Sequence, residues 1–275
     1  MDQVLKEDMI NLFSMYMRVT GVPYLGSSLT GEPGLIGKTL GIVNGSSWIE
    51  FWVNFFGKKI LKGVKFVNVG NEGIQLNFMK AHSEGKPCPP TRNVEAFARY
   101  ARDLVELADV DAILISCSTM NRSYTTVQES VKHYGVPVVS IDMPMMEEAV
   151  DHGGKVLVVA THGPTVRNTQ MLLEETAEKM GRKVTYTGTT VEEAFELLGE
   201  GKIVEHNKLI ADAISESRKK EDIGVAVLAQ LSMSVFKLSY PDAEKEFGIP
   251  VITSAEAGFR RIKDIFLNNV KKEIF

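Results

Sequence analysis

The stretch Asp111-Ala-Ile-Leu-Ile-Ser-Cys-Ser-Thr-Met120 decides the fold, because its pattern returns at Gly224-Val-Ala-Val-Leu-Ala-Gln-Leu-Ser-Met233. Each copy is a short apolar run that ends in a small polar loop, as expected of a buried strand in a parallel sheet. The loop begins at Cys117 in the first copy and at Gln230 in the second, and in each a Gly-x-Pro sequence brings a proline 20 positions later. Cys117 and Gln230 are therefore predicted to be equivalent positions in two related halves.

Short β-branched runs alternate with longer helical patterns from about residue 37 to the end of the chain, which is typical of βαβ units. This pattern predicts an α/β protein with two similar parallel-sheet lobes related by a pseudo-twofold axis and a site in the cleft between them. We expect an N-terminal extension over residues 1–36, a first lobe over 37–142 that is joined by 254–275, and a second lobe over 143–253. Within the extension, residues 4–17 have the spacing of an amphipathic helix, packed on the body or on a second subunit. The predicted strands are 39–43, 65–69, 112–116, 136–141, 156–160, 184–187, 225–229 and 249–253.

Composition excludes several classes of function. The chain has 275 residues, 44% of them hydrophobic, and a net charge of −4 with no block of basic residues, so neither nucleic acid nor a membrane is an expected partner. Two cysteines form no disulfide framework and the histidines show no zinc-binding spacing, so we expect a cytoplasmic protein without a metal site. The acidic N-terminus does not resemble a signal peptide.

Four polar loops follow predicted strands, and in an open parallel sheet such loops face the ligand crevice. They are rich in hydroxyl groups and poor in fixed cations. Where such loops begin helices, their free backbone N–H groups suit an anion such as a carboxylate. The predicted cleft is therefore a candidate binding site for such an anion. The loops are residues 44–47, 117–119, 161–165 and 230–232.

These loops resemble those of the aspartate/glutamate/hydantoin racemase superfamily. The resemblance extends over roughly residues 37–275 and depends on Ser116-Cys-Ser-Thr119, Ala160-Thr-His-Gly-Pro-Thr165 and Gln230-Leu-Ser232. It implies a cofactor-independent isomerase, usually a homodimer, whose site lies between two similar domains. In such racemases two cysteines flank the α-carbon of the substrate, one removing its proton and the other returning a proton to the opposite face.

The resemblance also implies roles for individual residues. Cys117 would be the acid/base group, and its place at a strand-to-helix turn is one where a helix N-terminus can lower a thiol pKa toward neutrality. Other residues match family positions that hold the substrate carboxylate and its α-substituent by hydrogen bonds. They are Asn44, Ser46, Ser118, Thr119, Thr161, Thr165 and Ser232, and Gln230 is added to this predicted substrate-binding set.

The second cysteine of the family is replaced by Gln230, and an amide neither donates nor accepts a proton usefully near neutral pH. Two-thiol racemisation is therefore in question. His162 could supply the second acid/base, or could be a capping or surface residue. Cys88 is either an exposed loop thiol or a lid residue, while Asp142 and Glu256 are interpreted as helix caps.

The leading hypothesis is an enzyme that transfers a proton at the carbon α to a carboxylate of a small acid, such as an amino acid, a hydantoin or a related compound, with Cys117 as acid/base. The alternatives within enzymes are a cofactor-free decarboxylase and a cis–trans isomerase of a small dicarboxylic acid, each using one cysteine. The alternative of another class is a non-catalytic protein that binds a small carboxylate.

Overall fold

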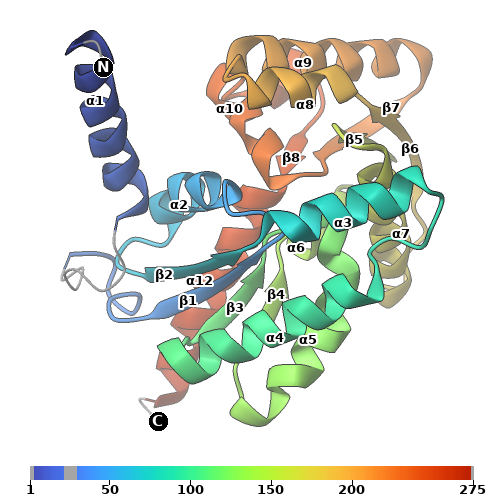
Figure 1. Cartoon of the computed structure of the whole chain (residues 1–275). Coiled ribbons are helices and arrows are strands. Elements are labelled where there is room, and N and C mark those ends of the chain that lie inside the picture. Colours follow the sequence, from blue (N-terminus) through green and yellow to red (C-terminus); the bar gives the residue numbers. More distant parts are fainter. Residues whose placement is uncertain (1–2, 22–29, 274–275) are drawn as a thin grey trace.

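The computed structural model describes residues 3–21 and 30–273, and its main feature is a pair of four-stranded parallel sheets (Figure 1). Residues 22–29 of the predicted N-terminal extension lie outside the described residues. The strands are β1 (Thr39–Asn44), β2 (Lys65–Gly70), β3 (Ala112–Ile115), β4 (Val138–Ser140), β5 (Lys155–Ala160), β6 (Thr185–Thr190), β7 (Ile223–Leu228) and β8 (Val251–Thr253).

Helices connect the strands. They are α1 (Gln3–Thr20), α2 (Ile49–Ile60), α3 (Glu72–Ser83), α4 (Thr91–Ala108), α5 (Tyr124–Val131), α6 (Asp142–His152), α7 (Gly163–Lys179), α8 (Glu192–Gly199), α9 (Ile203–Lys220), α10 (Phe236–Ser239), α11 (Ala243–Phe247) and α12 (Ser254–Glu273). Three 3₁₀ segments are also present among the described residues: η1 (Ser118–Ser123), η2 (Lys132–Tyr134) and η3 (Leu231–Val235).

The two sheets have the same strand order, which confirms the predicted repeat. The order is β2-β1-β3-β4 in the first sheet and β6-β5-β7-β8 in the second. Register agrees as well: Ile42 pairs with Leu114 in the first sheet, and Val158 pairs with Val227 in the second. All eight predicted strands are present, in two α/β lobes.

One end of each of β4, β6, β7 and β8 differs from the prediction by two residues or more, and β7 begins two residues early, at Ile223. β4 and β8 each begin two residues later than expected, directly after Pro137 and Pro250, because a proline has no N–H to donate to the ladder. β6 continues to Thr190, although its last residues carry no apolar pattern. It is an edge strand with one partner, and an edge strand tolerates such polar residues on its exposed face.

Alternate residues of each strand enter the cores on opposite faces of the sheets. In β3, Leu114 packs with α2 and α12 on one face, while Ile113 packs with α4 and α5 on the other. In β5, Leu157 faces α9, and Val158 faces α6 and α7. Each lobe is therefore a three-layer α/β unit with both faces of its sheet buried.

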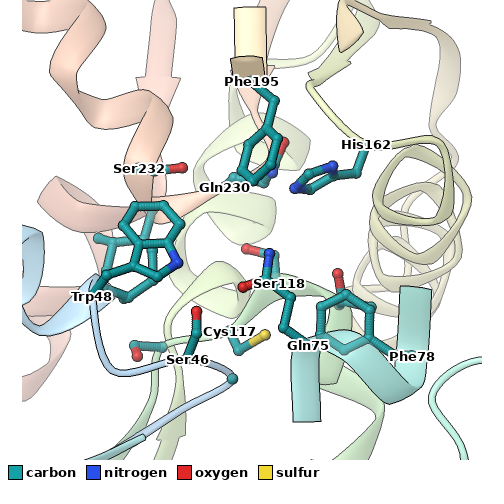
Figure 2. A pocket seen from close by; sticks show the side chains of 15 residues that line it. Ser46, Trp48, Gln75, Phe78, Cys117, Ser118, His162, Phe195, Gln230 and Ser232 are labelled. Atoms are coloured by element: carbon teal, nitrogen blue, oxygen red, sulfur yellow. The ribbon is translucent and has the colours of Figure 1, made fainter. Parts of the chain in front are cut away.

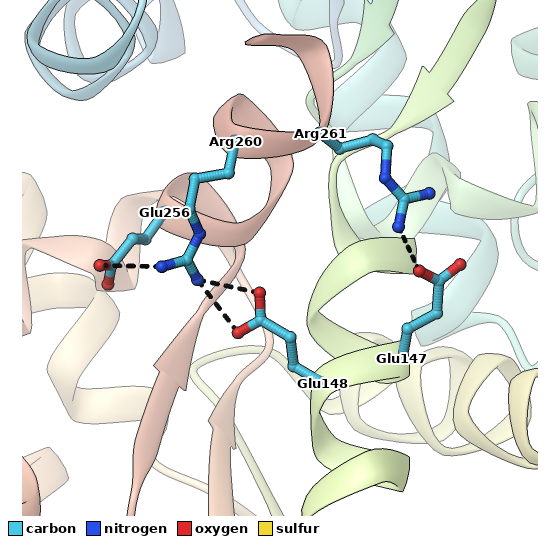
Figure 3. A network of polar contacts seen from close by, with 5 residues as sticks. All are labelled: Glu147, Glu148, Glu256, Arg260 and Arg261. Atoms are coloured by element: carbon cyan, nitrogen blue, oxygen red, sulfur yellow. Dashed lines mark hydrogen bonds and ion pairs between the residues drawn. The ribbon is translucent and has the colours of Figure 1, made fainter. Parts of the chain in front are cut away.

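The C-terminal helix α12 returns to the first sheet after the second lobe is complete. Phe259, Ile262 and Phe266 are fully buried there among residues of β1 and β2. Beside this apolar contact, two ion pairs join α12 to α6 (Figure 3). Arg260 pairs with Glu148 at an N–O distance of 2.9 Å, and Arg261 pairs with Glu147. These exposed ion pairs add little energy, so the buried aromatic side chains hold α12 in place.

The predicted N-terminal helix is present as α1, which extends to Thr20 and projects from the body (Figure 1). Tyr16 stacks on Phe51 of α2 with ring centroids 6.4 Å apart. Several apolar side chains of α1 are exposed, among them Leu12 and Phe13 at 61% and 65%. None of the described helices is long and apolar enough to cross a membrane.

Candidate active site

A pocket of about 460 Å³, partly open to solvent, lies between the two lobes at the carboxyl ends of their strands (Figure 2). Its polar lining comes mainly from the loops after β1, β3, β5 and β7, as predicted, and its apolar lining comes from α2, α3, α8 and η3. The polar lining residues are Ser46, Gln75, Ser116, Cys117, Ser118, Thr119, His162, Gln230 and Ser232, and the others are Gly45, Trp48, Ile49, Phe78, Phe195 and Leu231.

Cys117 lies at the end of β3, where extended backbone (φ −110°, ψ 111°) turns into η1. Its thiol is partly exposed and points into the pocket (Figure 2). Gly45, in the loop after β1, lies so close that a Cβ at that position would be 2.7 Å from the Cys117 sulfur. A side chain at position 45 would therefore force the Cys117 sulfur to move.

The pKa of the Cys117 thiol shifts opposite to the expectation from its strand-to-helix turn. Removal from bulk water raises the pKa to about 12, and the neighbouring Asp142 carboxyl also raises it. Backbone N–H groups of Met120, Thr119 and Gly45 act in the other direction without outweighing burial. The expected lowering toward neutrality is therefore wrong for this structure, and the thiol holds its proton at neutral pH.

Asp142 lies behind the Cys117 loop and is not the helix cap expected from the sequence, because Ile141 occupies the cap position of α6 and no side chain caps that helix. It is fully buried as the first residue of α6, and Ser118 Oγ donates a hydrogen bond to its Oδ1 at 3.1 Å. Burial raises the Asp142 pKa to about 7, although the hydrogen bond from Ser118 lowers it. The carboxyl group thus changes charge near neutral pH. It contacts Ser118, the residue that follows Cys117 in the chain.

Gln230 occupies the position in the second lobe that Cys117 occupies in the first, with extended backbone (φ −138°, ψ 142°) before η3. The Thr161 N–H and hydroxyl donate to its Oε1 at 2.6 and 3.0 Å. Because a backbone N–H can only donate, these bonds identify the amide oxygen and leave the Gln230 NH₂ group as a donor. Figure 2 shows Cys117 and Gln230 on opposite sides of the pocket.

His162 lines the pocket at the start of α7, against the ring of Phe195 at a centroid distance of 4.0 Å. Burial lowers its pKa to about 4. At neutral pH the imidazole is therefore uncharged and is a weak base. Glu256, by contrast, is exposed on α12 and pairs with Arg260, away from the pocket lining.

The other predicted site residues differ in position. Asn44, Thr161 and Thr165 do not line the pocket but lie behind its wall. Asn44 accepts a hydrogen bond from Ser116, while the Thr165 hydroxyl is 3.2 Å from that of Thr119 across the two lobes. These three residues hold the lining loops in place.

Cys88, considered as a lid residue, does not line the pocket. Its sulfur lies 3.7 Å from the carbonyl oxygen of Phe78, and its side chain packs against the core between the first sheet and α4. Of the two cysteines, Cys117 alone belongs to the described pocket lining.

Sequence reasoning missed the pocket residues that come from helices. Gln75 and Phe78 enter from α3, and Phe195 enters from α8. Their positions are ordinary members of amphipathic patterns, which predict a buried face and not which residue reaches a cleft. Trp48, just before α2, also lines the pocket.

Comparison with known proteins identifies relatives. The family described as Asp/Glu/Hydantoin racemase matches residues 84–262, whereas no curated protein sequence matches the chain. A glutamate racemase from Bacillus anthracis superposes with a TM-score of 0.58 at 18% identity, covering 85% of this chain and 83% of that one. An aspartate racemase homologue from Pyrococcus horikoshii OT3 gives 0.58 at 20% identity, covering 83% and 99%.

An allantoin racemase from Klebsiella pneumoniae has the same fold, with a TM-score of 0.58 at 16% identity over 83% of this chain and 87% of that one. At these identities the structural likeness establishes the two-lobed fold. The family match covers more than half of the chain and includes the loops that begin at Cys117, Thr161 and Gln230. The chain therefore belongs to the Asp/Glu/hydantoin racemase family, whose members named in these comparisons are isomerases.

Proposed function

We propose that this protein is a cofactor-independent enzyme that transfers a proton at the carbon α to a carboxylate of a small acid, with Cys117 as acid/base. The observation that carries the proposal is the position of the Cys117 thiol: it lies in a pocket between the lobes, on a strand-end loop and opposite Gln230. Family membership supports a racemase-type reaction at an α-carbon.

The raised thiol pKa favours proton donation. A thiol with a pKa of about 12 is protonated at neutral pH, and a carbanion is a far stronger base than a thiolate. The S–H bond then breaks, its proton bonds to the α-carbon, and the thiolate regains a proton from water. In the reverse direction the thiol first ionises and then removes the α-proton, which is slower because the thiolate is scarce.

The surrounding donors suit the charge that develops on the substrate carboxylate. The hydroxyls of Ser46, Ser118 and Ser232 line the pocket, and the Gln230 NH₂ group faces it as an additional donor. Preorganised donors of this kind stabilise an enediolate at little reorganisation cost. Gln230 therefore acts as a hydrogen-bond donor in the proposal, and Cys117 transfers the proton.

The test is the exchange of α-protons in heavy water. Candidate acids are incubated with the protein and the loss of the α-proton signal is followed by NMR. We expect Cys117→Ala to reduce exchange by at least ~100-fold, while Cys88→Ala, the matched cysteine variant outside the pocket, retains it. Exchange that persists in Cys117→Ala would eliminate the assigned role.

A cofactor-free decarboxylase is the second candidate, and the Gln230 amide favours it. With its Oε1 held by Thr161, Gln230 does not remove a proton, and the uncharged His162 imidazole of the same lobe is a weak base. In a decarboxylase the carbanion forms without proton removal: the bond from the α-carbon to one carboxylate breaks, CO₂ leaves, and the electron pair remains on carbon. Cys117 then protonates one face.

The two candidates give different products from a malonic acid with two different α-substituents. A decarboxylase releases CO₂ and yields one enantiomer of the product, since the thiol reaches one face. An enzyme limited to α-proton exchange releases no CO₂. Measurement of CO₂, followed by chiral chromatography of the acid, separates them.

A further inference from the structure

The pocket has a charge pattern that restricts its ligand. Among its described lining residues none is Lys, Arg, Asp or Glu. The lining offers hydroxyls, amides, one thiol and one imidazole, together with a set of apolar side chains. A carboxylate can be held by such neutral donors, but a second charged group on the same ligand has no counterion among these residues.

Two titratable groups at or behind the pocket wall, His162 and Asp142, provide no counterion for a second charged group. His162 is packed against Phe195, and burial keeps its ring uncharged at neutral pH, so it supplies no cation. Asp142 is fully buried behind Ser118 and does not line the pocket, so it neither pairs with a ligand ammonium group nor favours a second carboxylate. Burying an unpaired charge is costly, so the site selects against it.

Aromatic rings also line the pocket, and one of them, Phe195, packs directly against His162. Trp48 belongs to the first lobe and Phe195 to the second, and their ring centroids are 6.5 Å apart at an interplanar angle of 56°. Phe78 of α3 adds a third ring to the lining. Figure 2 shows the Trp48 and Phe195 side chains at the edge of the space above Cys117. Rings at such distances form a favourable surface for a further flat, apolar group.

We infer that the substrate carries its charge only in an anionic head at the α-carbon, either one carboxylate or the two of a malonic acid. Its α-carbon also carries an uncharged, ring-bearing apolar substituent, which packs on the Trp48–Phe195 ring pair, a clasp formed by the two lobes. The anionic head lies at the hydroxyl groups beside Cys117. Acids with a second carboxylate in the side chain, such as aspartate and glutamate, are poor ligands. This inference rests on the proposed function, because it names the substrate class of the same site.

Trp48 reports binding directly. The chain contains two tryptophans, so Trp52→Phe leaves Trp48 as the single tryptophan, beside the pocket. Fluorescence titrations then compare phenylacetate, acetate and glutarate, which differ in the group attached to the carboxymethyl unit. We expect phenylacetate to bind roughly 10- to 100-fold more tightly than acetate, from burial of the ring, and glutarate to bind no more tightly than acetate.

The clasp is tested by variants of Phe195 in the same background. Phe195→Ala should reduce phenylacetate affinity by about 10-fold and leave acetate affinity unchanged, since acetate does not reach the ring. Phe195→Leu keeps apolar volume on α8 and controls for folding, and it should retain part of the preference. Unchanged phenylacetate affinity in Phe195→Ala would overturn the clasp, as would glutarate binding as tightly as phenylacetate or phenylacetate giving no response at millimolar concentration.

These outcomes are separable from those of the proposed function. If phenyl-substituted acids bind with the expected preference but show neither α-proton exchange nor CO₂ release, the ligand class holds and the proposed activity fails. If glutamate or aspartate exchanges its α-proton in a Cys117-dependent reaction while phenyl-substituted acids do not, the activity holds and the present inference is overturned.

Discussion

Replacement of Gly45 by alanine moves the Cys117 thiol without removing it, and therefore tests whether its position matters. The new methyl group would lie 2.7 Å from the sulfur, whereas its contacts with the Cys117 Cβ and with Phe78, at 3.5 and 3.6 Å, are ordinary. The backbone of Gly45 is not in the left-handed region, so alanine adds no conformational strain there. The clash is confined to one atom pair.

The magnitude follows from that distance. The sulfur has to retreat from 2.7 Å to at least the 3.4 Å of ordinary contact, a displacement of about 0.7 Å. Because a misplacement of about 1 Å costs on the order of 100-fold in rate, we expect α-proton exchange to fall by roughly 10- to 100-fold. Local overpacking should lower the free energy of unfolding by about 1 kcal/mol, at the low end of such substitutions.

The assay combines three measurements on Gly45→Ala in a Cys88→Ala background: α-proton exchange in heavy water, the rate of Cys117 alkylation, and denaturant unfolding. Gly199→Ala is the matched control, because a Cβ at Gly199, at the end of α8, meets no atom within 4 Å. Retention of the exchange rate within two-fold in Gly45→Ala, with normal folding, would refute the assignment of Cys117 as a positioned acid/base.

Three further predictions concern charge, symmetry and stability. Between about pH 4 and 7 the folded state keeps Asp142 protonated (its pKa of about 7 against 3.8) while the unfolded chain does not, so stability falls as pH rises, by about 4 kcal/mol in total. Asp142→Asn removes this loss in pH-dependent denaturant titrations relative to wild type, and it also speeds Cys117 alkylation because the thiol pKa falls. Gln230→Cys supplies a second thiol, and chiral chromatography should then detect racemisation of an enantiopure acid that the wild type leaves unchanged. Phe266→Ala leaves a cavity at a fully buried position between α12 and the first sheet, and it should lower the free energy of unfolding by about 3–5 kcal/mol in denaturant titrations. A decrease of less than about 1 kcal/mol would contradict the assigned role of α12.

The repeat could be predicted from the sequence because it is encoded in short apolar runs of fixed spacing. The equivalence of Cys117 and Gln230 follows from that spacing alone, and in the structure both residues end a strand and precede a 3₁₀ turn. The C-terminal end of β6 could not be predicted from apolar spacing. Its threonine-rich end carries no apolar alternation, and its inclusion in the sheet depends on a partner strand, β5, distant in sequence.

The electrostatics of the site could not be predicted, since they depend on what surrounds each group. A turn before a helix suggested a lowered thiol pKa, but the same loop is enclosed by both lobes and lies beside Asp142. Burial outweighs the turn's N–H groups. Likewise, nothing in the sequence near Phe195 indicates that its ring meets Trp48, which lies in the other lobe 147 positions earlier.

The two halves of the pocket share a backbone conformation but carry different side chains. Cys117 and Gln230 have similar extended backbone conformations and both precede a 3₁₀ turn, so the fold presents the same loop to both faces of a substrate. Since the backbones are similar, the side chains of these loops decide what each face can do, and the first of them is a thiol in one lobe and an amide in the other. In the proposed reaction the thiol on one side exchanges a proton, whereas the amide on the other, held by Thr161, only donates a hydrogen bond. Two loops of similar backbone thus carry a thiol on one face and none on the other, and for that reason chemistry on one face is the outcome that this geometry favours.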